Sequence, residues 1–386
     1  MLTKRLSFRA MFKKSGADDS SEKEWENVSM PSSATEQTED ATTETTKTGN
    51  SAAEVAGGAS ELDLVFVIDN TGSMSSWIRN VQENVKNIIH EIVVSESCDV
   101  RFGLVSYRDH PPQDHTFVTQ KHDFTSNVSK MQKWVNEMQA QGGGDAPEAV
   151  ADGLYDALHL SYRPNSTKVA IVVADAPPHG IGCFSDGFPN GCPSGHDPLK
   201  IVKQMGEKGI TIYTVICGNF EGQAFYQGIA QMTGGQYVPL AQAHLLTRAI
   251  VSGAQEEIAL ERLMGEAQEA VAEEERAAGR ELGEEEITAK LEDMFKRKGT
   301  VTRQTRFGGE ELPDYEASAA LYSGAASLSD VRAAPTREHL AFGSHGGGID
   351  AAPAMASAPM TSGFGSVTSH QCKRMARKSK ARGGLF

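Results

Sequence analysis

Apolar runs of strand length alternate along the chain with segments in which apolar residues recur every three or four positions. The run LDLVFVID at 62–69 is apolar at nearly every position, as in a strand that is covered on both faces. The segment 73–94 has the spacing of one helix face, with apolar residues at Trp77, Val81, Val85, Ile88, Ile89 and Ile92. This change of period predicts a strand followed by a helix.

The same alternation continues for about 200 residues. Strands are predicted at 99–109, near 115–120, and at 167–175, 210–217 and 234–240. Helices are predicted at 126–140, 147–160, 197–209, 220–234 and 241–258, with Ser126 or Asn127 near the cap of the first and Pro147 in the first turn of the second. We therefore expect a doubly wound α/β domain at 61–256 with a mostly parallel, six-stranded sheet.

The segments that flank this domain have a different composition. Residues 1–60 have a basic start and a Ser-, Thr- and Glu-rich remainder, which predicts a disordered leader. Residues 257–298 are rich in Ala and Glu and predict a charged, solvated helical extension of coiled-coil character. Residues 299–386 are rich in Gly, Ser and Ala and predict a disordered tail with a basic C-terminus.

The composition of the chain argues against several classes of protein. The net charge of −14 argues against nucleic-acid binding. Five irregularly spaced cysteines are too few for a disulfide scaffold, so we expect a reducing, cytoplasmic location. We find no apolar run long enough to span a bilayer and no signal peptide, although the basic segments at both ends allow peripheral contact with acidic lipid.

Oxygen-bearing side chains follow the strands at the edge where such sheets bind ligands. Asp69, Thr71 and Ser73 follow the first strand, and Asp175 ends the strand that should lie beside it. Asp145 follows three glycines in the loop between them. Three carboxylates and two hydroxyls suit a hard cation, which predicts a Mg²⁺ site, with Ca²⁺ or Mn²⁺ as alternatives.

Four of these five residues also have a structural interpretation. Thr71 or Ser73 could cap the following helix, and Asp69 could stabilise its N-terminal dipole. Asp145 could do the same for the helix that starts near Pro147. Asp175 has no such alternative, since a carboxylate at the end of a buried strand needs a partner.

The motifs DLVFVIDNTGSMSSW, GGGDAPEA and VVADAPPHG, in this order and spacing, resemble the von Willebrand factor type A domain, most closely its intracellular subgroup beside atypical alpha-kinases. The resemblance covers about 61–260 and implies a metal-ion-dependent adhesion site. The usual DxSxS pattern is matched by Asp69, Thr71 and Ser73, and the third-loop Asp by Asp175. The second loop departs from the family, because Gly144 and Asp145 stand where the family has a metal-binding Thr.

The loop after the 167–175 strand contains a second candidate site. His179, Cys183, Cys192 and His196 offer two nitrogens and two thiols, which could hold zinc. Their spacing matches no well-attested zinc motif, so a polar surface loop is the alternative, and a Cys183–Cys192 disulfide is a further one. We interpret the DHPPQDH segment at 109–115 as structural or solvated.

The leading functional hypothesis is a non-enzymatic module that docks a protein partner through the metal site, with an Asp or Glu of the partner completing the ion's coordination. The alternative is a Mg²⁺-dependent phosphoryl-transfer enzyme, or a truncated relative or partner of an alpha-type kinase. Phosphatases of that kind carry a second Asp two residues after the nucleophile, and here that position is Thr71.

Overall fold

The structure, a computed structural model, describes residues 61–96, 98–334 and 359–383. The predicted leader at 1–60 lies outside the described residues. A six-stranded sheet has the order β3-β2-β1-β4-β5-β6. Its strands are β1 Glu61–Asp69, β2 Asp99–Tyr107, β3 Thr119–Thr125, β4 Thr167–Ala174, β5 Ile210–Cys217 and β6 Tyr237–Leu240. All neighbouring pairs are parallel except β2 and β3, so the doubly wound, mostly parallel sheet predicted from the sequence is confirmed.

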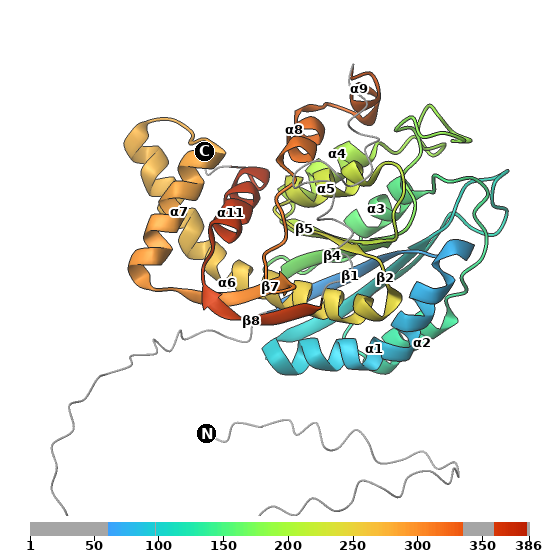
Figure 1. The fold of residues 1–386 in the computed structure, drawn as a ribbon, viewed down its shortest axis with the longest axis horizontal. Coiled ribbons are helices and arrows are strands. Elements are labelled where there is room, and N and C mark those ends of the chain that lie inside the picture. Colours follow the sequence, from blue (N-terminus) through green and yellow to red (C-terminus); the bar gives the residue numbers. More distant parts are fainter. Residues whose placement is uncertain (1–60, 97, 335–358, 384–386) are drawn as a thin grey trace, which may run out of the picture. The chain divides into compact units, whose positions relative to one another are not determined.

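Helices cover both faces of this sheet (Figure 1). One face carries α1 Ser75–Glu96, α2 Val128–Glu137 and the start of α6 Leu246–Ala278, and the other carries α3 Val150–Leu158, α4 Pro198–Glu207 and α5 Gln223–Met232. Two short 3₁₀ turns, η2 Gly72–Met74 and η3 Ala243–Leu245, precede α1 and α6. Among the helices of the described ranges, none combines the length and apolar character needed to cross a bilayer.

Side chains of β1 alternate between two hydrophobic cores. Leu64, Phe66 and Ile68 pack against the helices of one face, whereas Val65 and Val67 pack against those of the other. Successive side chains of a strand point to opposite faces, so a central strand covered on both sides must be apolar throughout. This arrangement explains why the sequence of β1 is a continuous apolar run.

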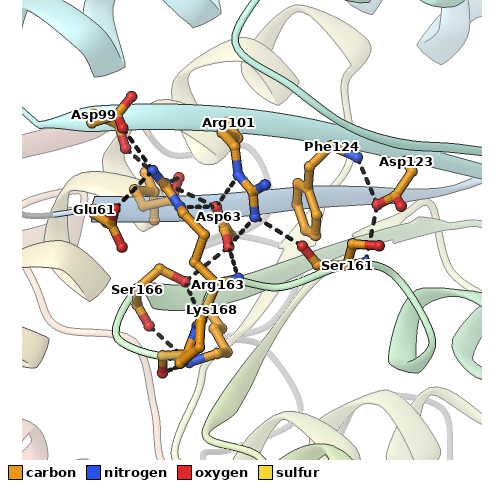
Figure 2. A network of polar contacts seen from close by, with 12 residues as sticks. Glu61, Asp63, Asp99, Arg101, Asp123, Phe124, Ser161, Arg163, Ser166 and Lys168 are labelled. Atoms are coloured by element: carbon orange, nitrogen blue, oxygen red, sulfur yellow. Dashed lines mark hydrogen bonds and ion pairs between the residues drawn. The ribbon is translucent and has the colours of Figure 1, made fainter.

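A buried ion-pair network ties the N-terminal ends of β1, β2 and β4 together (Figure 2). Asp63 is fully buried and accepts hydrogen bonds from the guanidinium groups of Arg101 and Arg163, the Arg163 backbone amide and the Ser166 hydroxyl. Burial alone would raise the pKa of Asp63, but these bonds, led by the one from Arg101, lower it. The network lies at the opposite strand ends from the predicted metal site.

The chain beyond 256 is more ordered than its composition indicates. The predicted solvated extension consists of the rest of α6 and of α7 Glu284–Lys298. The predicted disordered tail contains β7 Val301–Phe307, α8 Glu316–Gly324, α9 Leu328–Arg332, β8 Met360–Ser366 and α11 Ser369–Ala381, while 335–358 and 384–386 lie outside the described residues. Strands β7 and β8 form an antiparallel pair.

Two contributions explain this difference. A third apolar cluster joins α6, α7 and α11 through residues such as Leu260, Leu291 and Met375. The basic residues of α11 also face acidic residues of α6: Arg374 pairs with Glu256 and Glu257, and both its guanidinium and the ammonium of Lys378 are buried. These contacts join segments about 115 residues apart in sequence, so local composition does not indicate them.

Candidate functional site

The predicted site lies where the winding direction of the sheet reverses. Strands β1 and β4 are neighbours, with Ile68 opposite Val173. Asp69 is the last residue of β1, and Asp175 directly follows β4. The parallel register therefore brings these two carboxylates to the same edge, in the position where open α/β sheets bind ligands.

Hydrogen bonds connect four of the five predicted ligands. Asp69 Oδ1 accepts from the Thr71 backbone amide at 2.9 Å and from Thr71 Oγ1 at 2.6 Å. Thr71 Oγ1 lies 3.1 Å from Ser73 Oγ, which donates to Asp175 Oδ1 at 3.0 Å. Oxygens from two loops thus meet at one point.

The capping interpretation of Thr71 receives no support from these contacts. Thr71 is the N-cap residue of η2, but its side chain makes no capping hydrogen bond there. Its hydroxyl donates to Asp69 instead. The dipole interpretation of Asp145 receives no support either, because α3 begins at Val150 with Ala149 as its N-cap rather than near Pro147.

Asp145 lies with a different set of neighbours from the other four. Its Oδ2 accepts a short hydrogen bond from the Gly187 backbone amide. Its carboxylate groups with Asp109 and His179, with one possible ligand atom of each within 4.8 Å of the others. Burial, opposed by the Gly187 bond and reinforced by Asp109, raises the pKa of Asp145.

Three further residues lie near the site: Asp109, Glu148 and His179. None was predicted as part of it, and His179 was considered only as a possible zinc ligand. Asp109 follows β2 and is fully buried, so of the two interpretations of 109–115, structural or solvated, the solvated one does not apply to it. Glu148 is also buried, and burial together with the charges of Asp69 and Asp109 raises its pKa to about 11. A signal for Asp109 existed, since it follows a buried strand of the same sheet, as Asp69 does.

His179 supplies positive charge to this cluster. Its Nε2 lies 2.7 Å from Asp109 Oδ1 and its Nδ1 lies 2.8 Å from Asp186 Oδ1. Burial alone would lower the pKa of His179, but the hydrogen bonds to these two carboxylates raise it to about 9. A protonated His179 offsets part of the negative charge of its neighbours.

Buried carboxylate oxygens of this region are left without a hydrogen-bond partner. They are Asp69 Oδ2, Asp109 Oδ2, Asp145 Oδ1 and Glu148 Oε2. Burial, followed by the charge of Asp175, raises the pKa of Asp69 to about 7. Buried, unpaired carboxylates are costly unless a cation or a proton compensates them. The chemistry of these residues therefore fits a hard divalent cation.

The four residues of the second candidate site do not lie together in the structure. His179 belongs to the carboxylate cluster, and Cys183 lies near the backbone oxygen of Glu221, with 3.9 Å between Sγ and O. Cys192 and His196 instead contact Asp152. None of the five cysteines, all of which lie in the described residues, forms a disulfide, so Cys183 and Cys192 are not bridged.

Residues 63–184 match the family model of the von Willebrand factor A domain. An alpha-protein kinase, vwkA of Dictyostelium discoideum, is 34% identical over 137 residues, which are 35% of this chain and 22% of the kinase. A putative ariadne-like RING finger protein of Acanthamoeba polyphaga mimivirus is 25% identical over 199 residues, which are 49% of this chain and 19% of that protein.

This chain thus spans about a fifth of the length of those two relatives. Among solved structures, a von Willebrand factor type A protein from Catenulispora acidiphila matches with a TM-score of 0.38 and 18% identity, over 52% of this chain and 43% of that one. The strand order, the three motifs and the family match agree that this part of the chain is similar to the von Willebrand factor type A domain.

Proposed function

We propose that this protein is a non-enzymatic binding module that docks a protein partner through a divalent-metal site. Asp69, Ser73 and Asp175 hold Mg²⁺, Thr71 fixes the orientation of Asp69, and Asp145 adds negative charge from the second loop. The observation that carries the proposal is the buried carboxylate oxygen Asp69 Oδ2, which has no hydrogen-bond partner. A bound cation supplies the missing partner and provides a coordination point for an acidic ligand.

The accessibility of the site supports docking from one side. Asp69 and Thr71 are buried, whereas Ser73 is exposed and Asp175 is partly exposed. An aspartate or glutamate of a partner can therefore approach beside Ser73. Because Glu148 stays protonated and His179 stays charged near neutral pH, the cluster is less negative than its number of acids indicates.

Calorimetry on the full chain tests the metal site. We expect one Mg²⁺ per chain in the wild type and at least about tenfold weaker binding in Asp69→Asn. Asp156→Asn is the matched control, since Asp156 pairs with Lys121 and lies outside the site. Titrations with Ca²⁺ and Mn²⁺ rank the ions. Equal binding by wild type and Asp69→Asn would reject the site.

A pull-down tests the docking role. A partner should bind the wild type in Mg²⁺, and should be lost both in EDTA and with Asp69→Asn. Replacing acidic residues of that partner one at a time would identify the carboxylate that approaches the ion. A partner whose binding is indifferent to EDTA would contradict metal-dependent docking.

The phosphoryl-transfer alternative has no specific observation in its favour among the described residues. Asp69 would be the nucleophile, but it is fully buried and its Oδ1 accepts two hydrogen bonds from Thr71. We also propose a cytoplasmic location, because five cysteines without a disulfide between them suit a reducing compartment. Phosphate release from a generic ester, lost in Asp69→Asn, would overturn the non-enzymatic proposal.

A further inference from the structure

A second group of metal-ligating side chains lies beside the carboxylate cluster and is separate from it. His110 follows β2, Asp152 belongs to α3, and Cys192 and His196 belong to the loop between β4 and α4. Ligand atoms of His110, Asp152 and Cys192 all lie within 4.8 Å of one another. Three chain segments that are distant in sequence therefore bring nitrogen, oxygen and sulfur to one point.

The individual distances suit a small metal ion. His110 Nε2 lies 2.9 Å and Cys192 Sγ lies 3.0 Å from the same oxygen, Asp152 Oδ2. The sulfur and the nitrogen are 3.8 Å apart. Ligands of tetrahedral zinc, at about 2.0–2.3 Å from the ion, are separated by about 3.3–3.8 Å. The distance between sulfur and nitrogen lies in this range, and small side-chain adjustments that lengthen the two distances to Asp152 Oδ2 would give that geometry.

His196 holds the second oxygen of the same carboxylate. Its Nδ1 lies 3.1 Å from Asp152 Oδ1. Its ring stacks on Tyr155, with ring centroids 3.9 Å apart and an interplanar angle of 11°. This contact resembles the outer hydrogen bonds that orient metal-bound carboxylates and histidines.

Burial distinguishes this group from a cluster of exposed surface side chains. His110 is 5% exposed and Asp152 is 6% exposed, while Cys192 and His196 are partly accessible. The ion would be held on the inner side and could enter from the loop side. A thiol and an imidazole favour zinc strongly over Mg²⁺, so the two sites select different ions by ligand type.

We propose that His110, Asp152 and Cys192 bind a zinc ion and that His196 acts as a positioning residue through Asp152. The ion fastens the loop after β4 to α3 and to the segment after β2. Asp109, the neighbour of His110, contacts His179 from that same loop. Zinc binding thus stabilises the loop that forms one wall of the carboxylate cluster.

Cobalt substitution on the full chain tests this proposal. Metal-stripped wild type should take up one Co²⁺ with a thiolate-to-metal absorption band, and one equivalent of Zn²⁺ should remove the band. Cys192→Ser should abolish the band. Cys183→Ser, a cysteine in the same loop but outside the cluster, should keep it. Replacing His196 with Ala should weaken Zn²⁺ binding by about 10–100-fold while the band remains.

Two further measurements keep the result interpretable. Asp69→Asn should retain the cobalt band, which separates this site from the proposed Mg²⁺ site. If Cys192→Ser does not fold, mass spectrometry of the wild type replaces it: Zn²⁺ should slow alkylation of Cys192. Absence of the band in the wild type, its persistence in folded Cys192→Ser, or alkylation of Cys192 at an unchanged rate would overturn the proposal.

Discussion

The Ser73 hydroxyl donates a hydrogen bond to Asp175 Oδ1 across 102 residues of sequence, with the two oxygens 3.0 Å apart. This contact joins the loop after β1 to the loop after β4. Since burial raises the pKa of Asp175, its charge is costly in the absence of a cation. The same carboxylate that destabilises the metal-free protein should therefore be needed for metal binding.

We predict opposite effects of Asp175→Asn on binding and on stability. Mg²⁺ affinity should fall at least about tenfold, because one anionic ligand is lost. The melting temperature of the metal-free protein should stay equal or rise, because one buried charge is removed. Calorimetry and thermal unfolding in EDTA measure the two effects. A lower melting temperature in EDTA together with unchanged Mg²⁺ affinity would show that Asp175 is purely structural.

The pH dependence of stability follows from two raised pKa values. The pKa of Asp69 is raised from 3.8 to about 7, and the pKa of His179 is raised from 6.5 to about 9. A group whose pKa is higher in the folded state stabilises it fully below the unfolded pKa and loses that contribution as the pH rises through the folded pKa. Both groups therefore make the metal-free protein less stable at pH 8 than at pH 6.

Thermal unfolding in EDTA at pH 6, 7 and 8 measures this decrease. Added Mg²⁺ should raise the melting temperature more at pH 8 than at pH 6, because protons compete with the ion for Asp69. Asp69→Asn should give a flatter profile. A metal-free melting temperature that rises from pH 6 to pH 8 would contradict the assignment.

The buried Asp63 network predicts a large stability effect far from the metal site. Asp63→Asn removes the charge that pairs Arg101 and Arg163 (Figure 2). Breaking a buried pair by removing one partner costs about 3–5 kcal/mol. The pKa of Asp63 is lowered, so its contribution is present above pH 3.8 and is lost as the pH falls through its folded pKa.

Urea unfolding at pH 7 with Mg²⁺ measures the cost for Asp63→Asn. Asp156→Asn is the control, because its partner Lys121 is exposed and such a pair contributes only about 0–1 kcal/mol. Similar costs for the two variants would show that the Asp63 network contributes little.

The sheet was predictable because its strands are buried on both faces and its helices carry one apolar stripe. The first-loop residues and Asp175 were predictable for a related reason: parallel strands end at the same edge, so residues after neighbouring strands must meet. Asp145 was placed beside them on its loop position and on the resemblance of that loop to the second loop of the family. A flexible glycine loop does not fix where its carboxylate points, and a carboxylate oxygen of Asp145 lies within 4.8 Å of possible ligand atoms of Asp109 and His179.

The sequence did not indicate contacts between segments that the order of the parallel strands does not bring together. Cys192 and His196 were considered with His179 and Cys183 because all four share one loop. Their partners Asp152 and His110 come from other segments. The same limit applies to α11. Its sequence alone indicates solvated basic residues, but acidic residues of α6 lie opposite them in the structure. Composition describes a segment, whereas burial depends on its neighbours.

The backbone conformation and close packing of Gly142 predict that the second loop requires glycine at this position. Its φ is +81°, and a Cβ there would lie 1.8 Å from Asp114 Oδ2. Its backbone oxygen accepts a hydrogen bond from the Gly72 amide in the first loop. Gly142→Ala should therefore lower both the melting temperature and Mg²⁺ affinity. Gly191→Ala is the matched control, since Gly191 has φ +113° and open space around it. Equal effects of the two changes would leave only backbone strain as the cause.

The pairing of Arg374 with Glu256 and Glu257 predicts that α11 stabilises the domain by charge as well as by apolar contact. Arg374→Met keeps most of the side-chain volume but leaves two buried glutamates without this partner. A change of this kind costs about 3–5 kcal/mol. Adding Glu256→Gln and Glu257→Gln to Arg374→Met should recover part of the loss, because the buried uncompensated charge is then removed.

Urea unfolding of the single and triple variants measures the recovery. If the triple variant is less stable than Arg374→Met, the glutamates stabilise the fold through other contacts, such as the hydrogen bonds of Glu256 with Gln371 and the Thr305 amide and that of Glu257 with Lys378.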